Sequence, residues 1–96
     1  MAETYQAFYI NEVRDLQLTI HDQDGNAFAP SAAAVNIKNE NGTTVVAASA
    51  AVSENVVTKK IDTTVTGTAG DYKVIWQIKK SGSTYYHITQ LEVQEW

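Results

Sequence analysis

Residues 71–79 read Asp-Tyr-Lys-Val-Ile-Trp-Gln-Ile-Lys, and this stretch carries the strongest structural signal in the chain. Apart from Ile75, apolar and polar residues alternate with a period of two, which is typical of a β-strand with one buried face. The residues that we expect to face the core together are Tyr72, Val74, Trp76 and Ile78. The fold is therefore expected to be organised around this strand.

Further strands are predicted along the rest of the chain. Their ranges are 16–20, 34–38, 43–46, 55–61 and 84–93. Asn41-Gly42 predicts a hairpin, because both residues tolerate the positive φ of a type I′ turn. Lys80–Ser83 predicts the turn of the last hairpin. The final strand changes phase, since Tyr86 and Ile88 fall on one face and Leu91 and Val93 on the other, so we expect a bulge near Thr89-Gln90.

The alanine-rich residues 46–53 are the one segment with helix propensity. They lack a polar face, and a helix this short is marginal in isolation. The sequence leaves two interpretations open for this segment, a turn of helix or an irregular crossing between two sheets.

Six or seven short strands, with turn signals every ~8–12 residues, are typical of an immunoglobulin-like β-sandwich. We therefore predict an all-β fold, an immunoglobulin-like sandwich of about seven antiparallel strands. Residues 15–96 are expected to form this single domain. Residues 1–14 are expected to be an N-terminal segment able to contact a partner.

Composition narrows the function of this 96-residue chain. It has no cysteine, which excludes disulfides, thiolate zinc sites and thiol nucleophiles. Its net charge of −4 disfavours nucleic acid and anionic membranes as partners. No apolar run near the start forms a signal-peptide core, so we expect the chain to be made in the cytoplasm.

Residues that could carry chemistry are few. His21 and His87 have no neighbouring nucleophile motif, and both are interpreted as ordinary polar residues. Asp22–Asn26 resembles a calcium loop, but the sixth and twelfth positions of that loop are Ala27 and Ala33 instead of glycine and glutamate. We therefore expect no catalytic residue, no metal and no cofactor.

Aromatic and apolar residues outside the expected core are candidates for contacting a partner. Ile75 lies between Val74 and Trp76, so a strand that points Trp76 inward must point Ile75 outward. Tyr85 is out of phase with Tyr86 and Ile88 and is expected to join Ile75 on the outer face of the last hairpin. The complete set of predicted partner-binding residues is Phe8, Tyr9, Ile75, Tyr85 and Trp96. For Phe8 and Tyr9, the alternative is the core face of a first strand.

Three stretches carry a family resemblance. Asp15–Asn26 combines an alternating strand with an Asp-x-Asp-Gly-Asn turn, Thr68–Val74 contains Gly-x-Tyr before a strand, and Tyr86–Val93 is a closing strand. Together they resemble the immunoglobulin-like domains of tailed-phage virion proteins. That family includes the N-terminal domain of lactococcal-phage baseplate upper proteins and various head or tail accessory proteins.

The resemblance implies a non-enzymatic structural protein of a bacteriophage virion, which decorates the capsid or accompanies the tail or baseplate. Its implied partners are other virion proteins, the major capsid or tail proteins, with several copies in each particle. The implied location is the virion, assembled in the host cytoplasm. The alternative is an immunoglobulin-like adhesion or carbohydrate-binding module of a bacterial surface protein, which would use Tyr85, Tyr86 or Trp96.

Overall fold

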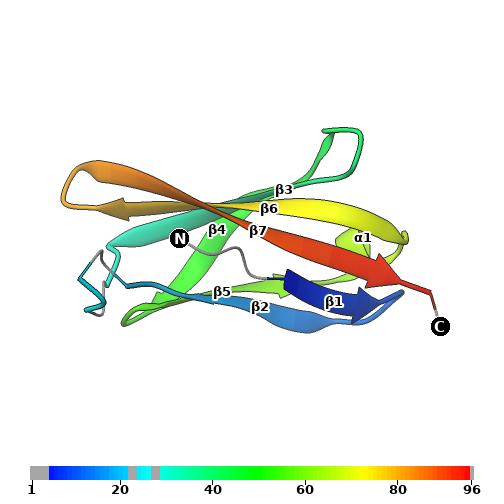
Figure 1. Cartoon of the computed structure of the whole chain (residues 1–96), viewed down its shortest axis with the longest axis horizontal. Helices are drawn as coiled ribbons and strands as arrows, with labels where there is room; N and C mark the ends of the chain where they lie inside the picture. Colours follow the sequence, from blue (N-terminus) through cyan, green and yellow to red (C-terminus); the bar gives the residue numbers. More distant parts are fainter. Residues whose placement is uncertain (1–4, 22–23, 27–28, 96) are drawn as a thin grey trace.

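A computed structural model describes residues 5–21, 24–26 and 29–95 of the chain, and they form seven strands and one helical turn (Figure 1). The elements are β1 (Tyr5–Tyr9), β2 (Arg14–Thr19), β3 (Ala32–Lys38), β4 (Thr44–Ser53), β5 (Val56–Ile61), α1 (Thr63–Thr66), β6 (Gly70–Lys80) and β7 (Ser83–Gln94). No helix among these residues is long and apolar enough to span a membrane.

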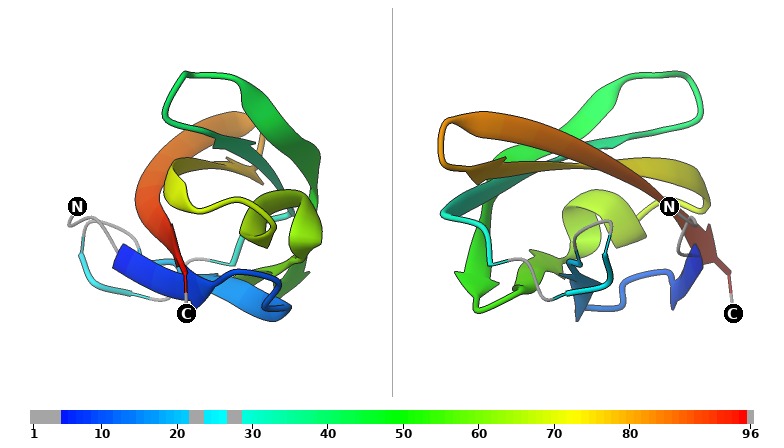
Figure 2. Two further views of the ribbon diagram at one scale, coloured as in Figure 1. Left: turned by 90° about the vertical axis from the view of Figure 1, so that its right-hand side faces the viewer. Right: turned by 60° about the vertical axis from the view of Figure 1, so that its left-hand side comes forward.

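The strands are hydrogen-bonded in the order β1-β7-β6-β3-β4-β5-β2. Seen end-on, this continuous sheet folds over so that β2 and β5 lie opposite β3, β6 and β7 (Figure 2). The all-β sandwich predicted from the sequence is confirmed. One strand pair departs from the antiparallel expectation, because β1 runs parallel to β7.

The core lies between the two layers and centres on β6. The four residues predicted to point inward, Tyr72, Val74, Trp76 and Ile78, are all buried. Leu16 and Leu18 of β2 and Val57 of β5 complete the core from the opposite layer. The Trp76 indole N–H donates a hydrogen bond to Thr89 Oγ1 at 3.0 Å, so this buried donor is satisfied within the core.

β7 is regular, and the expected bulge near Thr89-Gln90 is wrong. Its pairing with β6 continues without a shift from Gly70↔Val93 to Lys80↔Ser83. Thr89, Leu91 and Val93 point inward in unbroken alternation and are buried. The apparent change of phase in the sequence arises because two large hydrophobic residues, Tyr86 and Ile88, lie on the outer side of the sheet and not in the core.

The alanine-rich segment is the ten-residue strand β4, so the helical interpretation is wrong. β4 pairs with β3 from Thr44 to Ala50 and then with β5 from Ala51 to Ser53. The other interpretation, an irregular crossing between two sheets, is confirmed as to the crossing but not as to its irregularity, because the crossing is a regular strand. The change of partner falls between Ala50 and Ala51, where the side chains are small.

Two hairpin turns differ from each other in conformation. In the turn after β3, Gly42 has a φ of +83° and the Asn39 carboxamide accepts hydrogen bonds from the N–H groups of Asn41 and Thr43. Asn41 itself is not left-handed, so the type I′ turn expected at Asn41-Gly42 is wrong. Both central residues have positive φ at Ser81 (+52°) and Gly82 (+81°), in the turn predicted at 80–83.

The helical turn α1 connects the two layers at one end of the sandwich. Asp62 caps it, because its carboxylate accepts a hydrogen bond from the Thr64 N–H at 2.9 Å. Beyond the turn, the Tyr72 hydroxyl donates to the Thr68 carbonyl at 2.9 Å. A tyrosine at the start of a strand that bonds back to the preceding connection is the tyrosine corner of immunoglobulin-like sandwiches.

Residues 5–14, which the sequence analysis placed outside the domain, are integrated into the sandwich. β1 adds a strand beside β7, and Phe8 is fully buried in the core. The Arg14 guanidinium lies 4.3 Å from the centre of the Phe8 ring. The connection to β2 is held to α1 by a hydrogen bond from the Asn11 N–H to the Thr66 carbonyl at 2.8 Å.

Candidate protein-interaction surface

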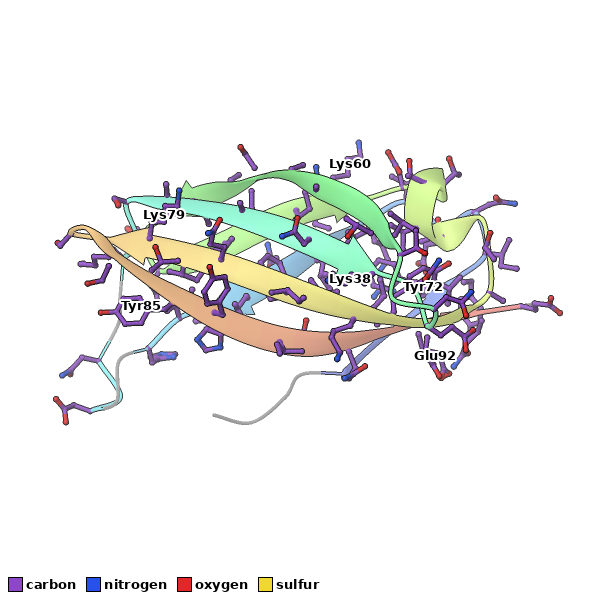
Figure 3. The ribbon with its side chains drawn as sticks, turned by 90° about the horizontal axis from the view of Figure 1, so that it is seen from above. Lys38, Lys60, Tyr72, Lys79, Tyr85 and Glu92 are labelled. Atoms are coloured by element: carbon purple, nitrogen blue, oxygen red, sulfur yellow. The ribbon has the colours of Figure 1, made fainter. Side chains whose placement is uncertain are left out.

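We define the outer face as the solvent-facing side of β3, β4, β6 and β7, which Figure 3 views from above. Residues paired across neighbouring strands share one side of a sheet, so the strand registers arrange this face in rows. Two central rows contain no charged residue. They are Ile88–Ile75–Asn36–Ala47 and Tyr86–Gln77–Ala34–Ser49.

The apolar part of the outer face lies on the β6–β7 hairpin. Ile88 is 43% exposed and Tyr86 is 65% exposed, whereas Ile75 between them is partly buried. Gln77 Nε2 lies 3.5 Å from the Tyr86 hydroxyl, within hydrogen-bond reach of the ring's polar end. These side chains form a patch with one exposed aromatic ring and no charge.

Lysines border the uncharged rows at both ends. Lys38 and Lys73 are directly opposite each other on one side, and Lys79 lies beyond the other row. Like charges placed directly opposite each other in a sheet are destabilising. The acidic pair Asp71↔Glu92 lies one row farther out. The border of this face is therefore positive in a chain whose net charge is −4.

The structure separates the five predicted partner-binding residues. Phe8 is in the core with none of its surface exposed, so its assignment to a partner contact is wrong. Tyr9 is 43% exposed, but it pairs with Gln94 at the end of β7. Gln94 is six residues from Ile88, so Tyr9 is about 20 Å from Ile88 along the strand direction. Trp96 lies outside the described residues.

Ile75 and Tyr85 do not share a face, which corrects the predicted patch. Tyr85 pairs with Ile78, a core residue, and therefore lies on the inner side of β7, where it is 48% exposed beyond the edge of the core. Ile75 pairs with Ile88. The prediction that Ile75 points outward is confirmed. Its large neighbours on the outer face, however, are Ile88 and Tyr86 and not Tyr85. Leu91 and Val93 point inward, so strict alternation counted back along the strand would have placed both Ile88 and Tyr86 on the outer face.

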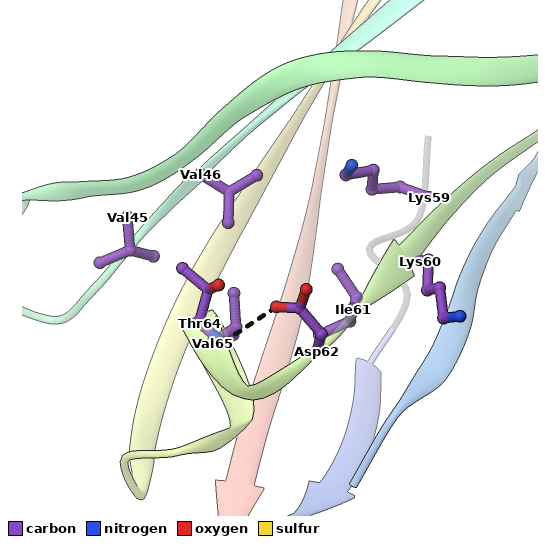
Figure 4. Close-up of a pocket in the computed structure, with 8 residues that line it drawn as sticks. All are labelled: Val45, Val46, Lys59, Lys60, Ile61, Asp62, Thr64 and Val65. Atoms are coloured by element: carbon purple, nitrogen blue, oxygen red, sulfur yellow. Dashed lines mark hydrogen bonds between the residues drawn. The ribbon is translucent and has the colours of Figure 1, made fainter. Parts of the chain in front are cut away.

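A hollow of about 210 Å³ lies beside α1, where β4 and β5 diverge (Figure 4). Val45, Val46, Ile61 and Val65 line it, together with Lys59 and Asp62. The hydrogen bond from the Thr64 N–H lowers the pKa of the Asp62 carboxyl, which therefore stays ionised as a helix cap. This volume is below the range usual for cofactor sites.

Titratable groups elsewhere fit structural roles. Burial lowers the pKa of the His87 imidazole, which is partly buried beside Trp76 in the register of the hairpin. Burial also raises the pKa of the Tyr72 phenol, whose proton is used in the tyrosine corner. The described part of the chain holds no group of three His, Cys, Asp or Glu side chains that could ligate a metal.

Comparisons with known proteins identify the fold class. No protein-family model and no curated protein matches the sequence. Among solved structures, tandem immunoglobulin domains of titin match with a TM-score of 0.55 and 15% identity, over 98% of this chain and 45% of that one. An I-band fragment of titin matches with a TM-score of 0.51 and 15% identity, over 97% of this chain and 30% of that one.

A third titin structure, in a trigonal crystal form, matches with a TM-score of 0.53 and 14% identity, over 98% of this chain and 92% of that one. The chain thus spans less than half of the first two titin fragments and nearly all of the third. The shared feature is the fold, an immunoglobulin-like β-sandwich.

Proposed function

We propose that this chain is a non-enzymatic immunoglobulin-like module that acts through protein–protein contacts made by its outer face. The observation that carries the proposal is the pair of uncharged rows, with exposed Ile88 and Tyr86, lying between lysines. Exposed apolar residues gathered in one place are typical of binding surfaces. Tyrosine is enriched among the residues that dominate binding energy.

The lysine border supports a partner with acidic groups around its contact surface. Lys38 and Lys73 repel each other in the free chain, and a carboxylate between them would relieve that repulsion. If two copies met through their outer faces, the lysines of one copy would instead lie against the lysines of the other. This holds whether the strands of the two copies run in the same direction or in opposite directions. The face therefore favours a different protein as its partner.

We further propose that the module is a structural component of a tailed-phage virion, either a capsid decoration protein or a tail or baseplate accessory protein. The support is the resemblance of Asp15–Asn26, Thr68–Val74 and Tyr86–Val93 to the immunoglobulin-like domains of such proteins. In this setting the partners are major capsid or tail proteins, and several copies act in each particle.

The test is the content of purified particles. Mass spectrometry should detect the chain in virions made from the genome that encodes it. The double variant Ile88→Ser, Tyr86→Ser should fold and melt like the parent but should be lost from the particles. Tyr85→Ser, on the other side of the same strand, is the matched control and should be incorporated normally. Absence of the parent chain from virions would reject the virion proposal.

A second candidate, glycan binding, has one observation in its favour. The exposed Tyr86 ring lies beside the amide side chain of Gln77, and a ring with a nearby amide suits a sugar face and its hydroxyls. A glycan array would test it. Saturable glycan binding that Tyr86→Ala abolishes, with no chain in virions, would favour this alternative.

A further inference from the structure

β4 has an edge that no described strand covers. From Thr44 to Ala50 it pairs with β3 on one side, and its pairing with β5 begins only at Ala51. A bulge at the start of the strand, where the register with β3 shifts between Ile37 and Lys38, leaves the segment Val46–Ala50 regular. Backbone groups of this segment that point away from β3 are available to another strand.

This edge lacks the features that usually prevent strands of different molecules from pairing. None of the ten residues of β4 is charged and none is proline. The two terminal strands of the sheet differ in this respect. β1 has only five residues, and β2 carries Arg14 and Asp15. Short length and charge are both common protections of sheet edges. Among the described strands, β4 thus combines an open edge with neither of these protections, while α1 and Lys59 lie beside its Val46 end.

We propose that the Val46–Ala50 edge of β4 pairs antiparallel with the same edge of a second copy of this chain. A twofold axis at Ala48 would place Val46 opposite Ala50 of the partner copy and Ala47 opposite Ser49 of the partner copy. All of these side chains are uncharged and most are small, so self-pairing brings no like charges together and no bulky groups into contact. The edge is therefore complementary to itself.

The pairing would join the layer that carries β1, β7, β6, β3 and β4 to its symmetry copy, with five strands contributed by each chain. The outer faces would become continuous and lie on the same side of the joined sheet. A five-residue strand pair buries little surface, so the dimer should be weak and dependent on concentration. We expect a dissociation constant on the order of 100 μM.

Analytical ultracentrifugation of the intact chain tests the proposal. The parent should show a monomer–dimer equilibrium, and the double variant Ala47→Lys, Ser49→Lys should sediment as a monomer at every concentration. The matched control, Gln17→Lys with Thr19→Lys, adds the same charge to exposed positions of β2 and should dimerise like the parent. A parent chain that stays monomeric up to about 1 mM would overturn the proposal.

Crosslinking gives a second measurement that does not depend on those variants folding equally well. Because the chain has no cysteine, single cysteines report on one position each. A mixture of Ala47→Cys and Ser49→Cys should form the mixed disulfide across the twofold axis faster than Gln17→Cys forms its own dimer. Equal rates would overturn the proposed pairing. Neither experiment involves a virion, so failure here is distinguishable from failure of the proposed function.

Discussion

Trp76 is the residue on which the core most depends. It is fully buried at the centre of β6, and its indole N–H is satisfied by Thr89 across the hairpin. The ring fills space between the two layers, and this chain has no cysteine that could link them by a disulfide. Trp76 is the largest fully buried side chain among the described residues.

Trp76→Ala should be the most damaging single substitution. Truncation of a buried aromatic residue typically costs about 3–5 kcal/mol, a large share of the ~5–15 kcal/mol that stabilises a domain. Thr89→Val should cost about 1–3 kcal/mol, because it leaves the indole N–H buried without an acceptor. Chemical denaturation measures both. Parent-like unfolding of Trp76→Ala, with collapse of Val74→Ala, would contradict the assigned inward face.

His87 gives the fold a modest pH dependence. Burial lowers its pKa below the ordinary value of 6.5, so the folded state favours the neutral imidazole and protonation favours unfolding. The stabilisation is therefore complete above pH 6.5 and declines as the pH falls through the lowered folded-state pKa. We expect the melting temperature to fall between about pH 7 and about pH 5, and to fall less in His87→Gln. Identical pH profiles for the two proteins would rule out this role.

At the scale of single elements, the β6–β7 hairpin defines both the core and the candidate surface. Its continuous register brings Trp76 inward and Ile75 outward from adjacent positions, and pairs each with a residue of β7. The hairpin closes through Ser81-Gly82, where both residues have positive φ. Serine in the left-handed region is strained, whereas asparagine tolerates it.

Ser81→Asn should therefore stabilise the protein, by about 0.5–1 kcal/mol, because Asn-Gly is the preferred sequence for such a turn. Gly82→Ala, at a φ of +81°, should destabilise it instead. Thermal unfolding of both variants gives the comparison. A lower melting temperature for Ser81→Asn than for the parent would contradict the assigned turn conformation.

The sequence predicted those elements whose burial pattern is simple. In β6 every second residue from Tyr72 to Ile78 is buried and the residues between them are exposed or partly buried, so its inward residues could be identified from the alternation. β7 could not, because Ile88 and Tyr86 are apolar residues on an outward face, and a pattern based on hydrophobicity assigns such residues to the core. The same two residues form the exposed part of the candidate surface. Misplacing them in β7 therefore also gave the wrong residues for the predicted partner-binding site.

β4 and α1 could not be predicted from the sequence, for a different reason. Alanine favours helix locally, but pairing with β3 and β5 holds residues 44–53 extended, so tertiary contacts override propensity. The single turn α1 is too short to show a helical period, and its local signals are only the caps, Asp62 before it and Gly67 after it. Tyr72 was correctly assigned to the core, whereas its hydrogen bond to Thr68 depends on how the connection folds back.

At the scale of the whole molecule, the sandwich presents two different sides. The layer of β2 and β5 carries charged residues such as Asp15 and Lys60 opposite each other, as expected for a surface that faces water. The outer face instead has two uncharged rows between lysines, with Ile88 and Tyr86 exposed among them. This asymmetry is the basis for the central claim that the outer face binds another protein.

Side-chain footprinting with hydroxyl radicals, applied to the free chain and to the chain within its assembled particle, tests that claim most directly. The labelling of Tyr86 and Ile88 should fall strongly on assembly, because both become covered by the partner. Tyr85 and Val13, which are 48% and 51% exposed away from the outer face, should keep their labelling. Unchanged labelling of Tyr86 and Ile88, with protection at Tyr85 or Val13, would contradict the claim.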